Sequence, residues 1–492
     1  MKLSLFSLIS RLGALTLGIA LISVSALRAQ EINLPELGSP SDQYLTPSAE
    51  KQLGRDFMLS VKKNANVLDD PLINEYVQDL GNRLLKQSEA TGQDFTFFVL
   101  DEPSINAFAG PGGYIGIHSG LILATQSESE LASVIAHEIA HVTQKHLLRA
   151  FDAANKMSGK TAALLLASIL VGVAGGADAG IAMATGAQAS AIQEQINFTR
   201  SNEEEADTVG IQLLADANFD PRAMPVFFER LTHASRIYES GVPEMLRTHP
   251  VTTNRIADAL GRAEQHGYKQ YPGSQRYFLT REALRVRQFK EPKEAIKHFA
   301  SGLDEGRHLN EEAHEYGYAL ALMRNRQYTK AQQIIGKLLE KSPQQIEYVL
   351  ASAELARLRG QSEKGLRTLE TYYTLMPENY PLSAAYIEAL TEAGDYDKAR
   401  QVAARVISFR TDNPRLYRLV GRVEELAGNQ AESHRMLAEA YVAEGQLRPA
   451  TQQLEIALRK VDKGDFQQVS RIESRLKRLQ EVVKRQEKES SR

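Results

Sequence analysis

The sequence predicts a mainly α-helical protein of the α+β class, with a small β-sheet in its first half and an α-solenoid in its second half. Three observations support this prediction. Apolar residues recur at helical intervals, two short runs in the first half resemble strands, and small residues recur at intervals of 34 to 36 residues after about residue 276. At 492 residues the chain is too long for one ordinary domain, so two or three are expected.

The composition is that of a globular protein, with 43% hydrophobic residues and a formal net charge of −3. Nothing in this charge balance indicates binding to nucleic acid. The chain contains no cysteine, which excludes disulfide bonds, a thiol nucleophile, cysteine-ligated zinc and a lipidated N-terminal cysteine.

Residues 1–29 have the pattern of a secretory signal peptide. Basic residues precede an apolar run from Leu12 to Val24, and cleavage is expected after Ala29 or, alternatively, after Ala26. An uncleaved membrane anchor is the other interpretation, although the run is shorter than the ~20 residues that a membrane-spanning helix needs. Export of a cysteine-free chain fits a bacterial periplasm, and the fold prediction starts at residue 30.

One amphipathic helix is predicted over residues 127–148, because a capping-box pair begins it and apolar residues follow at helical intervals. On this helix His137 and His141 are four residues apart, which places both imidazoles on one face at about 40° from each other. Glu138 lies one step round, close enough to take a proton from an attacking water. This H-E-x-x-H arrangement is typical of zinc peptidases.

A third metal ligand is expected from a second helical segment, residues 197–214. Glu203 and Asp207 are four residues apart on one face, and the small residues Ala206 and Gly210 allow close helix packing. A carboxylate is the expected third ligand once two histidines are placed, which assigns Glu203 to the metal and Asp207 to a position behind the ligands. Carboxylates that are simply solvated are the alternative.

Another group of zinc peptidases takes its third ligand from a histidine six residues after the second, but that position is Leu147 here. His146 lies nine residues after His137, about 180° round an ideal helix. We therefore expect His146 to face away from the metal, as a surface or packing residue.

Two strands are expected before the histidine helix. Residues 95–100 have the composition of a buried strand, and the turn Pro111-Gly112-Gly113 precedes a short Gly-rich strand. The Gly-rich strand would run along one side of the metal. There it either holds an extended substrate through main-chain hydrogen bonds or is only part of a core hairpin.

Residues 161–187 are unusual, because an almost wholly apolar stretch is interrupted by Asp178 and followed by glycine and alanine. The glycine content and the acidic residue argue against a transmembrane helix. A buried helical hairpin or an apolar flap over the cleft is expected, with peripheral contact to a membrane or to unfolded substrate as the alternative.

The second half of the chain shows the pattern of paired helices. Five small residues mark equivalent positions: Ala295, Ala331, Gly365, Ala399 and Ser433. Three glycines mark turns between helices at spacings of 34: Gly360, Gly394 and Gly428. We expect four to five tetratricopeptide repeats over residues 276–462, stacked around one continuous core. Ala450 leaves the register of the last repeat open, and residues 463–492 are expected to be a solvated basic tail, either helical or irregular.

The ordered combination of these motifs resembles the β-barrel assembly-enhancing proteases, periplasmic relatives of the HtpX-type and CAAX-prenyl-protease-type zinc peptidases. The resemblance covers H-E-x-x-H at 137–141, Glu-x-x-x-Asp at 203–207, the Pro-Gly-Gly strand and the repeats. It implies a zincin-type metallopeptidase domain over residues 30–262. It also implies an endopeptidase that helps outer-membrane proteins mature and cleaves unfolded or stalled ones, and docking to the barrel-assembly machinery through the repeats.

The expected site holds one Zn²⁺ per chain through His137, His141 and Glu203, with a water in the fourth position. Glu138 is expected to act as general acid–base, work typically worth roughly 10²–10⁴-fold in rate. Asp207 is expected to orient a ligating histidine, and the resemblance also allows it a proton-donor role.

His249 follows these motifs in a predicted loop, and family members carry a similar His-Pro pair. If its imidazole took the open metal position, it would displace the water and leave the enzyme latent. A structural loop histidine, or one that stabilises the oxyanion, is the alternative.

Two functions from different classes are therefore compared below. The first is a periplasmic zinc endopeptidase. The second is a chaperone or adaptor, in which the repeats bind clients and the metal site is latent. A bare repeat scaffold with an accidental motif would bind no stoichiometric zinc.

Overall fold

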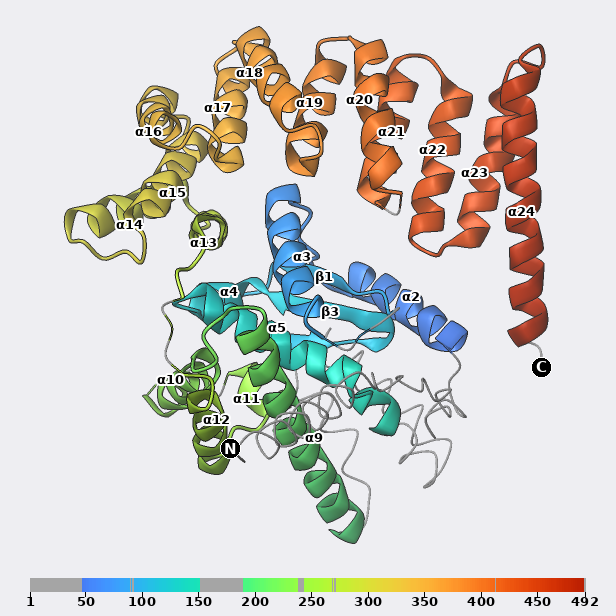
Figure 1. The fold of residues 1–492 in the computed structure, drawn as a ribbon. Helices are drawn as coiled ribbons and strands as arrows, with labels where there is room; N and C mark the ends of the chain where they lie inside the picture. The colour runs from blue at the N-terminus through green and yellow to red at the C-terminus, as the bar shows by residue number, and fades with distance from the viewer. Residues whose placement is uncertain are drawn as a thin grey trace, which may run out of the picture. The chain divides into compact units, whose positions relative to one another are not determined.

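The computed structural model describes residues 47–88, 90, 93–150, 189–237, 243–267, 269, 271–411 and 413–490. The predicted signal peptide at 1–29 and the apolar segment at 161–187 lie outside these residues. The elements of the first half, shown in Figure 1, are α2 (Pro47–Asn64), α3 (Pro71–Leu85), β1 (Thr96–Leu100), β2 (Ala107–Ala109), the 3₁₀ turn η2 (Pro111–Gly113), β3 (Tyr114–His118), α4 (Ser119–Ala124), α5 (Glu128–Thr143), α9 (Ala189–Asp216), α10 (Ala223–Ile237), α11 (Glu244–Thr248) and α12 (Thr253–Glu264).

A three-stranded sheet with the order β1-β3-β2 lies beside the histidine helix. β1 is parallel to β3, whereas β2 is antiparallel to it and pairs Phe108 with Gly116. Glycine is required at 116 because a Cβ there would lie 2.3 Å from the ring of Phe108. The predicted buried strand and the Gly-rich strand are both found, as β1 and β3, and the short β2 forms an edge of the sheet.

The helix α5 begins as its capping residues predict. The Ser127 side chain accepts a hydrogen bond from the Glu130 amide at 3.2 Å, but the Glu130 carboxylate accepts from Gln126 rather than from Ser127. Arg230 also donates to this carboxylate. α5 is buried all round from Glu128 to Ala140, so the expected amphipathic helix has no solvated face over that span. Its polar face meets other buried polar groups instead.

The long helix α9 packs directly on α5. Ala206 is fully buried in this contact, and a Cβ on Gly210 would lie 3.3 Å from the backbone nitrogen of His137. The two small residues thus permit the close helix approach that the sequence indicates. The consequence is that side chains one turn before them on α9 can reach the histidines of α5.

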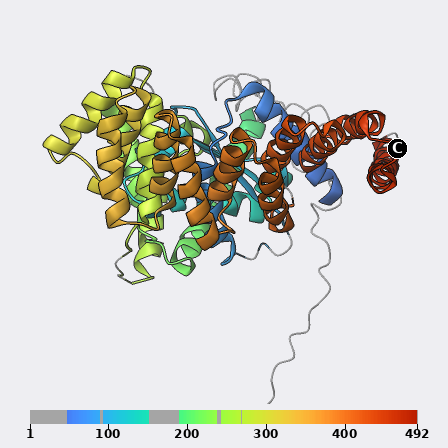
Figure 2. The same ribbon diagram turned by 90° about the horizontal axis from the view of Figure 1, so that it is seen from above.

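Paired helices make up the rest of the described chain, and successive pairs are visible in both views (Figure 1, Figure 2). They are α13 (Gln275–Gln288), α14 (Pro292–Asp304), α15 (Glu311–Arg324), α16 (Tyr328–Lys341), α17 (Ile346–Leu358), α18 (Ser362–Leu375), α19 (Tyr380–Glu392), α20 (Tyr396–Phe409), α21 (Pro414–Leu426), α22 (Gln430–Ala443), α23 (Leu447–Lys460) and α24 (Phe466–Ser490). The solenoid expected from the 34-residue period is therefore observed.

The predicted turn glycines lie between the helices of one pair. Gly360, Gly394 and Gly428 have φ values of 73°, 79° and 84°, a left-handed conformation that strains other residues. Gly445 repeats this turn between α22 and α23, with a φ of 75°. Ala450 follows Gly445 by the same five residues that separate Ser433 from Gly428. The open register is thus explained, because α22 serves as the second helix of one pair and the first helix of the next.

The C-terminal segment is helical and mostly exposed, as one of the two expectations for it has it, but one face packs on the repeats. It forms α24, which packs on α23. Ile472 and Leu479 are buried in this contact, seven residues apart on one face of the helix. Among the described residues, no helix combines the length and the apolar character needed to span a bilayer.

Candidate metal centre

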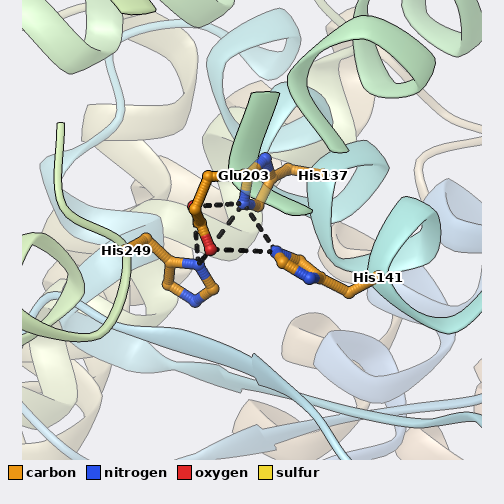
Figure 3. A group of neighbouring side chains, drawn as sticks. All are labelled: His137, His141, Glu203 and His249. Atoms are coloured by element: carbon orange, nitrogen blue, oxygen red, sulfur yellow. Dashed lines mark hydrogen bonds and ion pairs between the residues drawn. The ribbon is translucent and has the colours of Figure 1, made fainter. Parts of the chain in front are cut away.

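Two histidines of α5 and one carboxylate of α9 converge in the interior of the first half (Figure 3). Nε2 of His137 and Nε2 of His141 lie 3.0 Å apart. Glu203 brings Oε2 to 3.4 Å from the first nitrogen and Oε1 to 3.5 Å from the second. All three side chains are buried or nearly so, with 0%, 13% and 5% of their surface exposed. Glu203 is thus within reach of both histidines, as a shared metal site requires.

His249, which directly follows α11, contacts the same cluster. Its Nδ1 lies 3.0 Å from Oε1 of Glu203 and 3.4 Å from Nε2 of His137. With His141, the four residues each offer one ligand atom, and these atoms all lie within 4.8 Å of one another. Two imidazoles, a carboxylate and a third imidazole form a donor set that suits Zn²⁺.

Glu138 lies next to the cluster rather than in it. Its carboxylate is 1% exposed, and Oε1 lies 3.6 Å from Nε2 of His249. In the described part of the chain, the backbone N–H of Ala109 is directed at this carboxylate, whose oxygens otherwise have no hydrogen-bond partner of ordinary geometry. Burial raises the pKa of this carboxyl. A buried carboxylate with free acceptor capacity and a raised pKa is suited to receiving a proton near neutral pH.

Asp207 lies behind His137, one helical turn from Glu203. Its Oδ1 is 3.0 Å from Nδ1 of His137, the nitrogen that points away from the cluster. Arg255 holds Asp207 in a bidentate pair, with both distances 2.8 Å, and its Nη1 lies 3.0 Å from Oε2 of Glu203. The sequence offered no sign of this role for Arg255, because an arginine on the helix after the His-Pro loop has no spacing signature.

The charges of the cluster favour a cation at its centre. Burial alone would lower the pKa of His137, but the Asp207 and Glu203 carboxylates outweigh burial and raise this pKa to about 10. Burial would raise the pKa of Glu203, but His249 and His137 hold it well below its usual range. Burial and the neighbouring His137 lower the pKa of His141. The carboxylates therefore attract positive charge into a buried pocket, and a divalent cation bound there would replace the proton that His137 otherwise holds.

The expectation that His146 faces away from the site is wrong. Its residue surface is only 5% exposed, and its Nδ1 lies 2.8 Å from Nδ1 of His141. The rotation expected for an ideal helix does not apply, because α5 ends at Thr143 and Lys145 has a φ of 54°. A residue in the left-handed region changes the direction of the chain, and the spacing of apolar residues in the sequence does not reveal this change.

A cavity of about 260 Å³ opens onto the cluster and is lined by Glu138, His141, His249 and the β2 residues Phe108 and Ala109. The strand beside the cluster is therefore β2, which precedes the Pro-Gly-Gly turn, and not the Gly-rich strand expected there. The sheet order explains the difference, because β3 lies in the middle and β2 at the edge.

Comparison with known proteins assigns this site to a class. The model of Peptidase family M48 matches residues 71–263, and a Tetratricopeptide repeat model matches residues 356–423. Residues 71–263 thus have the sequence of an M48-type metalloprotease domain, and tetratricopeptide repeats follow it.

Full-length relatives make the assignment narrower. The beta-barrel assembly-enhancing protease of Escherichia coli K12 is 32% identical, over 92% of this chain and 92% of that protein. A Vibrio cholerae protein provisionally given the same name is 35% identical, over 91% and 92%. The chain belongs to the beta-barrel assembly-enhancing protease family.

More distant similarities cover less or carry less weight. The mitochondrial metalloendopeptidase OMA1 of Arabidopsis thaliana is 28% identical over 44% of this chain and 41% of that protein. Among solved structures, yeast Tom70 covers 90% of this chain at 12% identity with a TM-score of 0.27, which is too low to support an argument.

Proposed function

We propose that this metalloprotease is a zinc-dependent endopeptidase with one Zn²⁺ per chain, held by His137, His141 and Glu203. The observation that supports this proposal is the convergence of the three side chains from two helices within hydrogen-bonding distance of one another. When bound, zinc acts as a Lewis acid that polarises the scissile carbonyl and lowers the pKa of a water towards ~7.

The residues around the proposed metal site have separate roles in proton transfer and in positioning the ligands. Glu138 accepts the proton of the attacking water and delivers it to the leaving amine, because its oxygens are buried, lie next to the cluster and, apart from the Ala109 N–H, have no hydrogen-bond partner in the described residues. Asp207 lies 3.0 Å from Nδ1 of His137, where its carboxylate would accept the Nδ1 proton and fix the ring with Nε2 towards the metal. Arg255 keeps Asp207 in place.

The substrate is proposed to bind as an extended strand along β2. This strand is at the edge of the sheet, and in the described chain its outer side pairs with no other strand. Phe108 and Ala109 line the same cavity as Glu138. Main-chain hydrogen bonds to such an edge tolerate many sequences, as cleavage of varied unfolded proteins requires.

His249 is proposed as a regulatory fourth ligand. Its Nδ1 already lies among the other three ligand atoms. Binding of this nitrogen to the metal would occupy the position that the attacking water needs, so the enzyme would be latent until the loop moved. A role in stabilising the oxyanion remains the competing assignment, and the two predict opposite effects of removing the side chain.

The names of the relatives support a proposal about the biological setting. The two curated bacterial relatives come from Gram-negative species and carry names that refer to β-barrel assembly. By extension, we propose that this chain is exported to the periplasm, cleaves unfolded or stalled outer-membrane proteins, and contacts the barrel-assembly machinery through its repeats. A second candidate, a mainly chaperone-like adaptor, is favoured by the long array of paired helices, which can bind extended protein ligands.

Glu138→Gln tests the enzyme. This change should abolish cleavage of an unfolded model protein, by about 10²-fold or more, because the amide cannot accept a proton, while zinc content stays at one per chain. Glu204→Gln, an exposed glutamate of α9, is the matched control and should cleave normally. Full cleavage by Glu138→Gln would refute the assigned mechanism. Any support of outer-membrane protein assembly that Glu138→Gln retains belongs to the adaptor role.

A further inference from the structure

A histidine that binds a metal through Nε2 carries its proton on Nδ1, and that proton needs an acceptor that also fixes the ring. For His137 this acceptor is Asp207, which is held by Arg255. The family motif supplies no such acceptor for His141. The structure does supply an acceptor for His141. It comes from residues that have no role in the mechanism proposed above.

The acceptor for His141 is the ring of His146. The two Nδ1 atoms lie 2.8 Å apart, and the rings meet nearly edge to face at 79°. On its other side, Nε2 of His146 lies 3.2 Å from Oε2 of Glu205. Nη2 of Arg149 lies 2.6 Å from the same oxygen and 2.8 Å from Oδ1 of Asn202.

Only one arrangement of protons on the two imidazoles is compatible with these contacts when His141 is a ligand. His141 must donate from Nδ1, since its Nε2 faces the metal. His146 must then accept at Nδ1 and donate from Nε2, and Glu205 accepts that proton as a carboxylate held by Arg149. The opposite tautomer of His146 would bring two N–H groups together at 2.8 Å.

We propose that His146 and Glu205 are positioning residues for the metal ligand His141, equivalent in task to Asp207 and Arg255 for His137. The inference rests on the proposed metal site. Each ligand histidine then has its Nδ1 proton directed towards a carboxylate that an arginine holds, directly for His137 and through the His146 ring for His141. Both carboxylates come from α9, as does Glu203, so one helix aligns the whole ligand set.

The experiment measures zinc affinity and not only cleavage. Full-length protein carrying His146→Leu, His146→Asn, Glu205→Gln or Glu204→Gln is titrated with zinc against a chromophoric chelator, and each variant is also loaded with Co²⁺ for its visible spectrum. His146→Leu should bind zinc about 10–100-fold more weakly, the usual cost of losing such a partner, and should alter the Co²⁺ bands. His146→Asn should recover part of this affinity, because its amide oxygen can stand where Nδ1 stood.

Glu205→Gln should weaken zinc binding relative to Glu204→Gln, its exposed neighbour on the same helix, which should match the unmodified protein. Circular dichroism of the zinc-free variants shows whether each is folded. Equal zinc affinity in Glu205→Gln and Glu204→Gln overturns the proposal, and this comparison decides the matter if His146→Leu does not fold. A folded His146→Leu with undiminished affinity overturns it as well. If the unmodified protein binds no zinc, the proposed metal site is refuted. If it binds zinc with an affinity that does not depend on His146 or Glu205, only the positioning proposal is refuted.

Discussion

At the scale of single residues, His249 is the side chain with two incompatible tasks. Its Nδ1 contacts Glu203 and its Nε2 lies 3.6 Å from Glu138. The imidazole therefore lies between the proposed metal ligand and the carboxylate proposed to accept the proton of the attacking water. As a metal ligand it would exclude the attacking water. As an oxyanion donor it would assist the same reaction. Only removal of the side chain separates the two.

His249→Ala is predicted to raise cleavage of an unfolded model protein. A competing interaction of about 1.4 kcal/mol corresponds to about a tenfold change in the open fraction, which sets the scale of the gain. Initial rates of fluorescent peptide release measure it. His233→Ala, at a histidine whose side chain is 65% exposed, is the control and should change nothing. Reduced or unchanged cleavage by His249→Ala would count against latency.

At the scale of elements, the distance between α5 and α9 decides whether a site exists. The histidines belong to α5 and the third ligand to α9, and the helices touch where Gly210 faces the backbone of His137 and Ala136. Interiors are close-packed, so an added methyl group cannot be absorbed without movement. A shift of α9 away from α5 would also carry Glu203 away from the histidines.

Gly210→Ala is therefore predicted to destabilise the protein although alanine favours helix. A Cβ would lie 2.9 Å from Cε of Met224 and 3.3 Å from the His137 nitrogen, and such overpacking costs about 1–3 kcal/mol. Gly261→Ala on α12 meets no atom within 4 Å and should instead stabilise by up to about 1 kcal/mol. Thermal unfolding of both variants tests this difference in sign. A Gly210→Ala protein as stable as Gly261→Ala would show that the helix contact can relax.

At the scale of the whole described molecule, the first half is tied to the repeats by ion pairs between residues far apart in sequence. α3 contacts α13 and α19. Arg410, at the end of α20, pairs with Glu75 of α3, and Arg415 of α21 pairs with Asp69. The Glu75 side chain is 15% exposed. Burial raises the pKa of Glu75, and Arg410 offsets this only in part.

Arg410→Gln is predicted to destabilise the protein by about 1–2 kcal/mol near pH 7, between the values for exposed and fully buried pairs. Without Arg410 the pKa of Glu75 should rise further. An acid whose pKa is raised on folding contributes stability below its unfolded pKa and loses it as pH rises through the folded pKa. The destabilisation caused by Arg410→Gln should therefore become smaller as pH falls towards the acid range.

Urea denaturation across pH measures this effect. Glu75→Gln should remove the pH dependence of the Arg410→Gln effect, and Arg405→Gln, at an exposed arginine of α20, is the matched control. A destabilisation that is the same at every pH, or that persists unchanged in the Glu75→Gln background, would show that the carboxylate is not its cause.

The parts of the fold that follow a short-range period were predictable. The turn glycines of the repeats, the strands β1 and β3 and the helix with H-E-x-x-H depend on contacts between residues close in sequence, and periodicity records those contacts. The errors occur where a long-range contact overrides it. Lys145 in a left-handed conformation turned His146 into the site, and the sheet order put β2 rather than β3 beside the cavity.

The sequence by itself determined which groups can do the chemistry, because the spacing of His137, Glu138 and His141 on one helix fixes their angular relation. It also determined the repeat period and, through family resemblance, the expected third ligand. Tertiary structure alone decided what surrounds those groups: Arg255 behind Asp207, His146 behind His141, and His249 against Glu203. These relations join residues on different elements, and the distance between two elements is set by the packing of the whole core rather than by any local pattern.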